Sequence, residues 1–234
     1  NALLECNAHV FSFDTKKLNI KNSNFTHQFF DCKKLNFIEK NLNKFVNKFG
    51  CPDILINTSY PVLKKPIKNN FSEIKLQDFQ NDVNFHLLSY CWISKITSDL
   101  MVKNKISGKI VMMGSIYGSL GQDKNLYKNT KIKESFSYPI IKGGLVNFTR
   151  QMASFYGHKN IRINIINSGG LYGKSKVTNK KIESKFLKRY ESRVPLKRMG
   201  TTSEIASCIL FLVSDASSYV TGEVFTVDGG WSII

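Results

Sequence analysis

Short apolar runs alternate with longer amphipathic segments along the chain. The apolar runs have the length and composition of strands, and they cover residues 8–14, 25–31, 53–60, 108–115, 161–170 and 223–230. The segments between them repeat their apolar positions at helical spacing. The sequence therefore predicts helices over residues 36–50, 79–104, 140–157 and 202–215.

Strands that alternate with helices form βαβ units, which build a parallel sheet covered by helices on both faces. The strands "DILIN" and "KIVMM" are almost continuously apolar, as strands buried on both faces are. We therefore predict an α/β fold with a doubly wound parallel sheet in three layers, forming one domain over residues 1–234. In such sheets, ligands bind beyond the carboxyl ends of the strands.

Composition narrows the class of protein. The net charge is +17, but the lysines occur in small groups along the whole chain, mostly beside asparagines. This distribution favours solvated lysines over a nucleic-acid surface. The five cysteines are an odd number without tight spacing, and the four histidines are scattered, so we expect no metal site and a reducing, cytoplasmic location. The apolar runs are too short to span a membrane, and we expect no secretory leader.

Polar residues at the predicted strand ends suggest chemistry. Asp14 ends a strand, where a carboxylate can accept hydrogen bonds from the ribose hydroxyls of NAD and repel the extra phosphate of NADP. Ser115 ends another strand, and Tyr138 and Lys142 follow 23 and 27 residues later. A serine can orient a carbonyl oxygen, a tyrosine can exchange its proton, and a lysine ammonium lowers the pKa of the phenol.

Each of these residues also has a plainer interpretation. Asp14 could simply begin a turn, and Lys16 and Lys17 beside it weaken the preference for NAD over NADP. Tyr138 and Lys142, four residues apart on one helix face, could be a core aromatic residue and a surface lysine.

The combination of motifs resembles the short-chain dehydrogenase/reductase family over essentially all 234 residues. "DILINTSY" looks like its Asn-Asn-Ala-Gly strand, "GKIVMMGS" its serine strand, and "YPIIK" its Tyr-x-x-x-Lys motif. "INSGGLYG" falls where the family has Pro-Gly-x-Val/Ile, and the segment from "VPLKRMG" to "VDGGW" is similar to the family's C-terminus. The resemblance implies a Rossmann-type fold.

The resemblance also implies roles for individual residues. Tyr138 would be the general acid/base, and Asn84, in "DVNFHLLSYCWISK", would hold a water in a proton relay from Lys142. The implied catalytic residues are Ser115, Tyr138, Lys142 and Asn84. The implied cofactor-binding residues, for NAD or alternatively NADP, are Asp14, Asp31, Cys32, Asn57, Tyr138, Lys142, Gly169 and Leu171.

The front of the chain departs from the family. The family's first strand and Gly-rich turn are absent, and the sequence begins in what looks like the end of the first helix, "NALLECNAHV". Their loss would leave two internal strand edges unpaired and remove a helix N-terminus that seats the pyrophosphate. We therefore expect the natural protein to carry roughly 20–30 further N-terminal residues, a prediction that mass spectrometry of the purified protein tests.

An insert near the active site suggests the substrate. Residues 119–135 lengthen the segment between Ser115 and Tyr138, and "SIYGSLGQDKNLYKNT…SYPIIKGGL" resembles the flagellin modification protein A subgroup of the family. This resemblance implies a phosphorylated or nucleotide-activated sugar of surface-glycan synthesis, whose negative charge would suit the insert's lysines. Solvated surface lysines explain them equally well. These lysines are Lys124, Lys128, Lys131 and Lys133.

The leading hypothesis is thus an NAD(P)-dependent oxidoreductase that interconverts a secondary alcohol and a ketone on a small anionic sugar derivative. Two alternatives are a 3-oxoacyl-thioester reductase of the same family and a non-catalytic protein derived from it. The family usually forms dimers or tetramers, so we also expect a homo-oligomer.

Overall fold

The computed structural model describes residues 1–60, 69–173 and 183–234. All six predicted strands are present, and each lies within its predicted run. The strands are β1 (Val10–Asp14), β2 (Phe25–Phe29), β3 (Ile54–Asn57), β4 (Lys109–Met113), β5 (Arg162–Ser168) and β6 (Val224–Val227). The helices are α1 (Ala2–Glu5), α2 (Leu35–Phe49), α3 (Leu76–Asp82), α4 (Ser89–Lys103), α5 (Lys124–Tyr127), α6 (Ser137–Tyr156), α7 (Ser184–Arg193) and α8 (Thr202–Val213).

Every strand pairing in the described residues is parallel, which confirms the predicted sheet type. Strands β3, β4, β5 and β6 hydrogen-bond in that order, while β1 pairs with β2 in a separate ladder. Within the described residues no ladder joins β1 to β3. The facing edges of these two strands are the internal edges that the sequence predicts to be unpaired.

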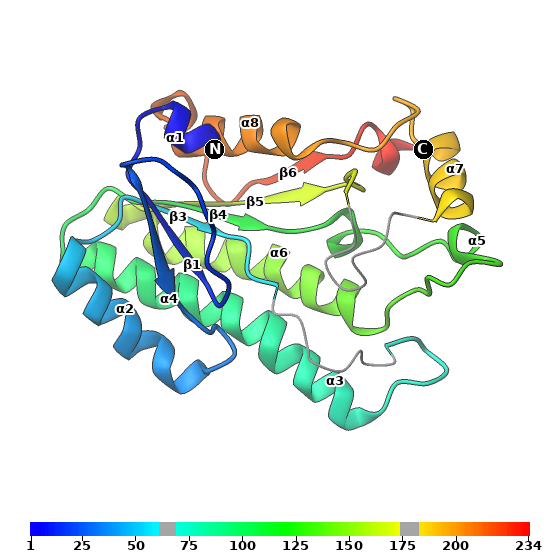
Figure 1. The fold of residues 1–234 in the computed structure, drawn as a ribbon, viewed down its shortest axis with the longest axis horizontal. Coiled ribbons are helices and arrows are strands. Elements are labelled where there is room, and N and C mark those ends of the chain that lie inside the picture. The colour runs from blue at the N-terminus through cyan, green and yellow to red at the C-terminus, as the bar shows by residue number, and fades with distance from the viewer. Residues whose placement is uncertain (61–68, 174–182) are drawn as a thin grey trace.

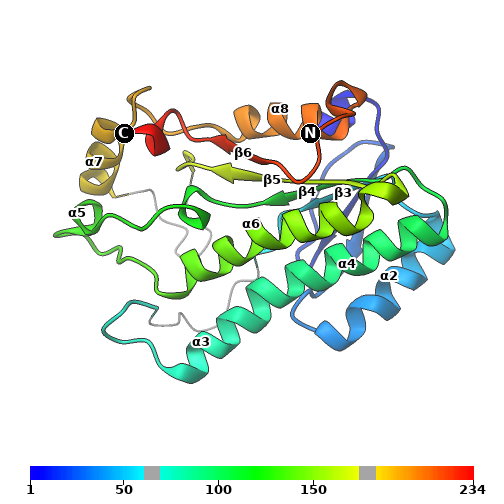
Figure 2. The same cartoon turned by 180° about the vertical axis from the view of Figure 1, so that it is seen from behind.

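Helices cover both faces of the sheets and make three layers (Figure 1). Helices α2, α4 and α6 lie side by side on one face, and α8 lies with α1 on the other (Figure 2). Helix α6 packs on β5, and α8 packs on β4 and β5. The predicted three-layer, doubly wound α/β architecture is therefore confirmed.

The two central strands form the core. Ile110, Val111 and Met112 of β4 are each at most 1% exposed, as are Ile163 and Ile165 of β5. Burying an aliphatic side chain of this size stabilises the fold by roughly 1.5–3 kcal/mol. Their almost continuous apolar sequence is required because helices cover them on both sides.

The long helix predicted over residues 79–104 is present but not uniform. A π-helical segment, Val83–Leu88, joins α3 to α4 without a break. Such segments widen the helix locally and are frequent at functional sites. Two helices were not predicted, namely α5 and α7, whereas α1 lies in the segment expected to be the end of a helix. No helix in the described parts of the chain is long and apolar enough to cross a bilayer.

Candidate active site

The carboxyl ends of β4 and β5 bring the first site residue into position. Ser115 follows β4 and is only 5% exposed, and its backbone N–H donates to Asn167 Oδ1 in β5 over 3.2 Å. Gly114 before it has no room for a side chain, because an added Cβ would lie 2.1 Å from that same Oδ1. The glycine at position 114 therefore allows the chain to approach β5 closely, and the hydrogen bond holds Ser115 against that strand.

Helix α6 brings Tyr138 and Lys142 to the same place, one helical turn apart. Gly118, just after the serine, lies so close to α6 that an added Cβ would be 2.9 Å from the Lys142 carbonyl oxygen. The Ser115 hydroxyl is a hydrogen-bond partner of the Tyr138 phenol. The predicted serine, tyrosine and lysine are thus brought together by the packing of the β4 loop on α6.

Lys142 is a buried cation, only 4% exposed. Its Nζ donates to the Met113 carbonyl oxygen at 2.7 Å and lies over the rings of Tyr90 and Tyr138, 5.1 and 5.7 Å from their centroids. A carbonyl and two ring faces stabilise positive charge, but they do not replace water completely. Burial accordingly lowers the pKa of Lys142 to about 8.

The pKa of Tyr138 does not follow the sequence-based expectation of a phenol acidified by the lysine. Burial raises the pKa of Tyr138, and the hydrogen bond with Ser115 opposes this effect. The Lys142 ammonium is directed to the Met113 carbonyl and lies over the face of the phenol ring. In this structure the phenol is therefore neutral at pH 7 and ready to donate its proton.

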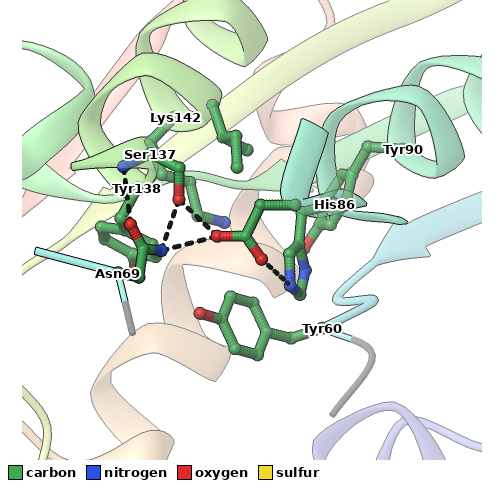
Figure 3. Close-up of a pocket in the computed structure, with 9 residues that line it drawn as sticks. Tyr60, Asn69, His86, Tyr90, Ser137, Tyr138 and Lys142 are labelled. Atoms are coloured by element: carbon green, nitrogen blue, oxygen red, sulfur yellow. Dashed lines mark hydrogen bonds and ion pairs between the residues drawn. The ribbon is translucent and has the colours of Figure 1, made fainter. Parts of the chain in front are cut away.

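Asn84 does not join this group, since its side chain is exposed. Two other residues of the same helical stretch do, namely Asp82 and His86, both 6% exposed. They line a pocket together with Tyr138 and Lys142 (Figure 3). Helical spacing could have found them, because positions 82, 86 and 90 repeat every four residues along one face, whereas position 84 points elsewhere.

Comparisons with known proteins show the family to which the chain belongs. A family model described as "Enoyl-(Acyl carrier protein) reductase" matches residues 23–232. The 3-oxoacyl-[acyl-carrier-protein] reductase FabG of Buchnera aphidicola subsp. Baizongia pistaciae is 34% identical over 200 residues, covering 86% of this chain and 74% of that protein. The chain belongs to the short-chain dehydrogenase/reductase family.

Two further relatives of this short-chain dehydrogenase/reductase bear on its chemistry. The post-translational flagellin modification protein A of Campylobacter coli is 28% identical over 192 residues, covering 82% of this chain and 72% of that protein. A short-chain dehydrogenase from Leptospira borgpetersenii, solved with bound NAD+, matches with a TM-score of 0.83 and 27% identity, covering 98% of this chain and 85% of that one. The chain is therefore an oxidoreductase of this family with its Rossmann-type fold.

The predicted cofactor residues of the reductase lie at the strand ends. Asp14 ends β1, and its exposed carboxylate accepts a hydrogen bond from the Lys16 N–H at 2.9 Å. Asp31 likewise accepts from the Lys33 N–H at 3.1 Å, and the half-buried Cys32 packs against the core beside α2. In both aspartates Oδ1 accepts a hydrogen bond from a backbone N–H two residues later. The other carboxylate oxygen, Oδ2, can therefore still accept a hydrogen bond from a ligand.

Asn57, Gly169 and Leu171 lie at the ends of β3 and β5. Asn57 is 2% exposed, and its amide donates to the Tyr90 carbonyl and the Ser94 hydroxyl, both at 3.3 Å, so it ties β3 to α4. Gly169 lies so close to β6 that an added Cβ would be 2.8 Å from the Asp228 Cα. Leu171 forms an isolated parallel bridge with Gly200.

The insert packs on a helix that the sequence did not predict. Asp123 caps α5 and pairs with Arg193 of α7 at 2.6 Å. Arg189 of α7 donates to the carbonyl oxygens of Leu126 and Lys128. Of the insert's lysines, Lys133 already pairs with Glu73 at 2.7 Å. The insert and α7 therefore pack together as one unit. Because Lys133 is paired, fewer of the insert's lysines are available to a ligand than the sequence suggests.

No group of three or more His, Cys, Asp or Glu side chains in the described residues is arranged to hold a metal ion.

Proposed function

We propose that this oxidoreductase interconverts a secondary alcohol and a ketone with NAD as the preferred cofactor. The observation that carries the proposal is the convergence of Ser115, Tyr138 and Lys142 at the carboxyl edge of the parallel sheet, where ligands bind in such folds. The nicotinamide, when bound, supplies or accepts the hydride. The protein's own residues then have to orient the substrate oxygen and move one proton.

The three side chains fit that task. The Ser115 hydroxyl is placed to hydrogen-bond the substrate oxygen, and the neutral Tyr138 phenol to donate a proton to it during ketone reduction. The ammonium of Lys142, which lies over the Tyr138 ring, would place a positive charge near the phenolate that results. In alcohol oxidation the same groups act in reverse.

The residues at the strand ends fit a dinucleotide. The exposed carboxylate of Asp14 suits a ribose diol and disfavours a 2′-phosphate, which supports NAD over NADP. Asp31 and Cys32 would flank the adenine side, with Asn57 alongside the cofactor. Residues from β5 onward, Gly169 and Leu171, would lie against the nicotinamide.

The proposed substrate is an activated or phosphorylated keto-sugar. The relative named for flagellin modification supports this substrate class, and the exposed lysines of the insert, such as Lys124 and Lys131, would attract its phosphate. A 3-oxoacyl thioester is the second candidate, because the relative with 34% identity is a 3-oxoacyl-[acyl-carrier-protein] reductase.

Cofactor binding and turnover test the proposal together. The full-length protein is titrated with NADH and NADPH, and oxidation of the reduced cofactor is then followed with nucleotide-linked, phosphorylated and free keto-sugars and with a 3-oxoacyl thioester. We expect tighter binding of NADH and the fastest turnover with a charged keto-sugar. In the matched variant Asp14→Asn, the preference for NADH should shrink.

Three outcomes would change the assignment. Faster turnover of the thioester would assign the second candidate substrate. Equal turnover of charged and free sugars would remove the role of the insert lysines. Failure to bind either nucleotide would contradict the enzymatic proposal itself.

A further inference from the structure

The loop that follows β5, residues 169–172, is held in place by helix α7. The N–H groups of Gly169 and Tyr172 donate to backbone carbonyl oxygens of other segments, each at 2.9 Å. Gly170 differs, because its N–H donates to a side chain, the phenol oxygen of Tyr190 in α7, at 2.5 Å. The backbone of this loop therefore depends on a side chain from a separate element.

The Tyr190 ring lies directly against the loop and is only 3% exposed. An added Cβ at Gly170 would lie 2.8 Å from the Tyr190 Cζ, and one at Gly169 would lie 3.1 Å from the phenol oxygen. The two glycines therefore allow the ring to approach the loop backbone closely. Removing the phenol oxygen would take away the acceptor of the Gly170 N–H and leave an apolar ring beside it, which is unfavourable.

An indole fixes the orientation of the Tyr190 ring. The buried Trp231 ring stacks on it, with a centroid distance of 4.5 Å and an angle of 14° between the two planes. The Arg193 guanidinium, three residues further along α7, lies over the same indole at 4.6 Å from its centroid. Stacked aromatic rings and a cation over an indole are both attractive contacts. The phenol oxygen is thus directed at Gly170 by a ring that the indole holds in place.

The packing around Tyr190 continues to the insert and to the serine. One buried apolar cluster contains Tyr190 and Trp231 together with Leu126 of the insert and Ile116, which directly follows Ser115. Helices α5 and α7 and the C-terminus lie at the same end of the molecule (Figures 1 and 2). The side chain that holds the loop therefore belongs to the same packed unit as the residue after the proposed catalytic serine.

The phenol of Tyr190 is neutral at pH 7. Burial raises the pKa of Tyr190, and the hydrogen bond from the Gly170 N–H opposes this effect. A neutral phenol oxygen accepts a hydrogen bond from a backbone N–H. The contact therefore needs no change of protonation, which separates the role of Tyr190 from that of the acid/base Tyr138.

We propose that Tyr190 is a positioning residue for the nicotinamide. By accepting the hydrogen bond from Gly170, it holds the loop where Gly169 and Leu171 would lie against the nicotinamide ring. This inference rests on the proposed function, since the contacts of these two loop residues with the cofactor belong to that proposal. Tyr190 touches neither substrate nor cofactor in this role and acts through the Gly170 backbone.

The position of the nicotinamide matters because hydride transfer requires the two reacting atoms to lie about 3–3.5 Å apart. A loop that forms one wall of the nicotinamide site therefore affects affinity at that end of the cofactor. It leaves the adenosine end, where Asp14 and Asp31 are placed, without a change of contacts. The two ends can be separated by experiment, because ADP-ribose has the adenosine end of NADH and lacks the nicotinamide.

Binding of NADH and of ADP-ribose to Tyr190→Phe in the full-length protein tests the role. This change keeps the ring and removes only the phenol oxygen. We expect the Kd of NADH to rise by roughly 3-fold to 10-fold, equally at pH 6 and pH 8, and the Kd of ADP-ribose to stay unchanged. The matched control is Tyr156→Phe, which removes another buried phenol, one that donates to Asp99 at 2.6 Å in the same fold. This control should change neither affinity.

The outcomes separate this inference from the proposed function. Equal weakening of NADH and ADP-ribose in Tyr190→Phe would show a general structural role and overturn the positioning role, and so would unchanged binding of both. In these two cases the wild type still binds the cofactor, so the proposed function stands. A wild type that binds neither nucleotide would overturn the proposed function and this inference with it.

Hydrogen exchange of the Gly170 amide in the resting protein gives a readout that needs no ligand. Loss of the phenol oxygen should speed this exchange by roughly 10-fold in Tyr190→Phe, because the amide loses its acceptor. In Tyr156→Phe the Gly170 amide should exchange at the wild-type rate. Exchange at the wild-type rate in Tyr190→Phe would contradict the hydrogen bond that the inference requires.

Discussion

At the scale of single residues, the site keeps a lysine where burial opposes its charge. The folded-state pKa of Lys142 is about 8, against an ordinary value of 10.5. Between these values the unfolded chain binds more protons than the folded one, so this residue makes stability rise with pH from about 8 to 10.5. At pH 7 its charge therefore costs stability that the fold must supply elsewhere.

Replacing this lysine with methionine should stabilise the protein at neutral pH. The pKa difference of about 2.5 corresponds to about 3.4 kcal/mol. Loss of the hydrogen bond to the Met113 carbonyl offsets about 1 kcal/mol of this. We expect Lys142→Met to gain about 2 kcal/mol at pH 7 in urea unfolding, and the gain should shrink at pH 10.

Lys95→Met is the matched control, because Lys95 is a surface residue paired with Asp99 at 2.6 Å. This control should change stability by less than about 0.5 kcal/mol. A Lys142→Met variant that is less stable than the wild type at pH 7 would show that burial does not destabilise the ammonium.

Only part of the site could be predicted from residues alone. Ser115, Tyr138 and Lys142 could be singled out in the sequence because their types and spacing are distinctive, and the structure brings them together. The buried His86 beside them was not predicted, because the resemblance pointed to Asn84, which the structure leaves exposed. Only the helix face decides which of the two is buried, and that face depends on the π-helical segment Val83–Leu88.

At the scale of elements, helix α8 has a complete N-terminal cap. Thr201 accepts a hydrogen bond from the Glu204 N–H at 3.3 Å, and the Glu204 carboxylate accepts one from the Thr201 N–H at 2.8 Å. Arg198 also donates to this carboxylate, which together with the cap lowers the pKa of Glu204 to about 2. The signature "TTSE" in the sequence matches this capping box.

Removing the cap should destabilise the protein by about 1 kcal/mol, because an orphan N–H of α8 loses its partner. We expect this loss in Thr201→Ala by chemical unfolding at pH 7, and little change in the adjacent, exposed control Thr202→Ala. The stabilisation from Glu204 is present above pH 4.5 and should be lost as pH falls towards 2. Equal losses in the two variants would contradict the capping role.

Strands were predicted better than helices for a physical reason. The strands of a doubly wound sheet are apolar runs that stand out in any window, as "KIVMM" does. Helix α5 is only four residues long and buries Leu126, and α7 is rich in charge and buries Tyr190, so their helicity depends on the contacts between them. Those contacts, such as Arg193 with Asp123, join residues far apart in the sequence.

At the scale of the whole molecule, the order of strands and helices determines which residues meet. Parallel strands place Asn57, Ser115 and Gly169 at one edge, and α6 adds Tyr138 and Lys142 to it, while Asp14 ends β1 in the separate β1–β2 ladder. The lysines behind the net charge of +17 occur in small groups along the whole sequence rather than in one basic segment. This net charge favours association with anionic small molecules and does not contribute to the choice of fold.

The acid/base role of Tyr138 is tested most sharply by the single-turnover rate of Tyr138→Phe in the full-length protein. This change removes only the phenol oxygen, so we expect NADH to bind with nearly unchanged affinity while hydride transfer to the ketone slows by roughly 100-fold or more. Transfer at the wild-type rate in Tyr138→Phe would contradict the assignment of Tyr138 as the acid/base, and with it the proposed chemistry of the site.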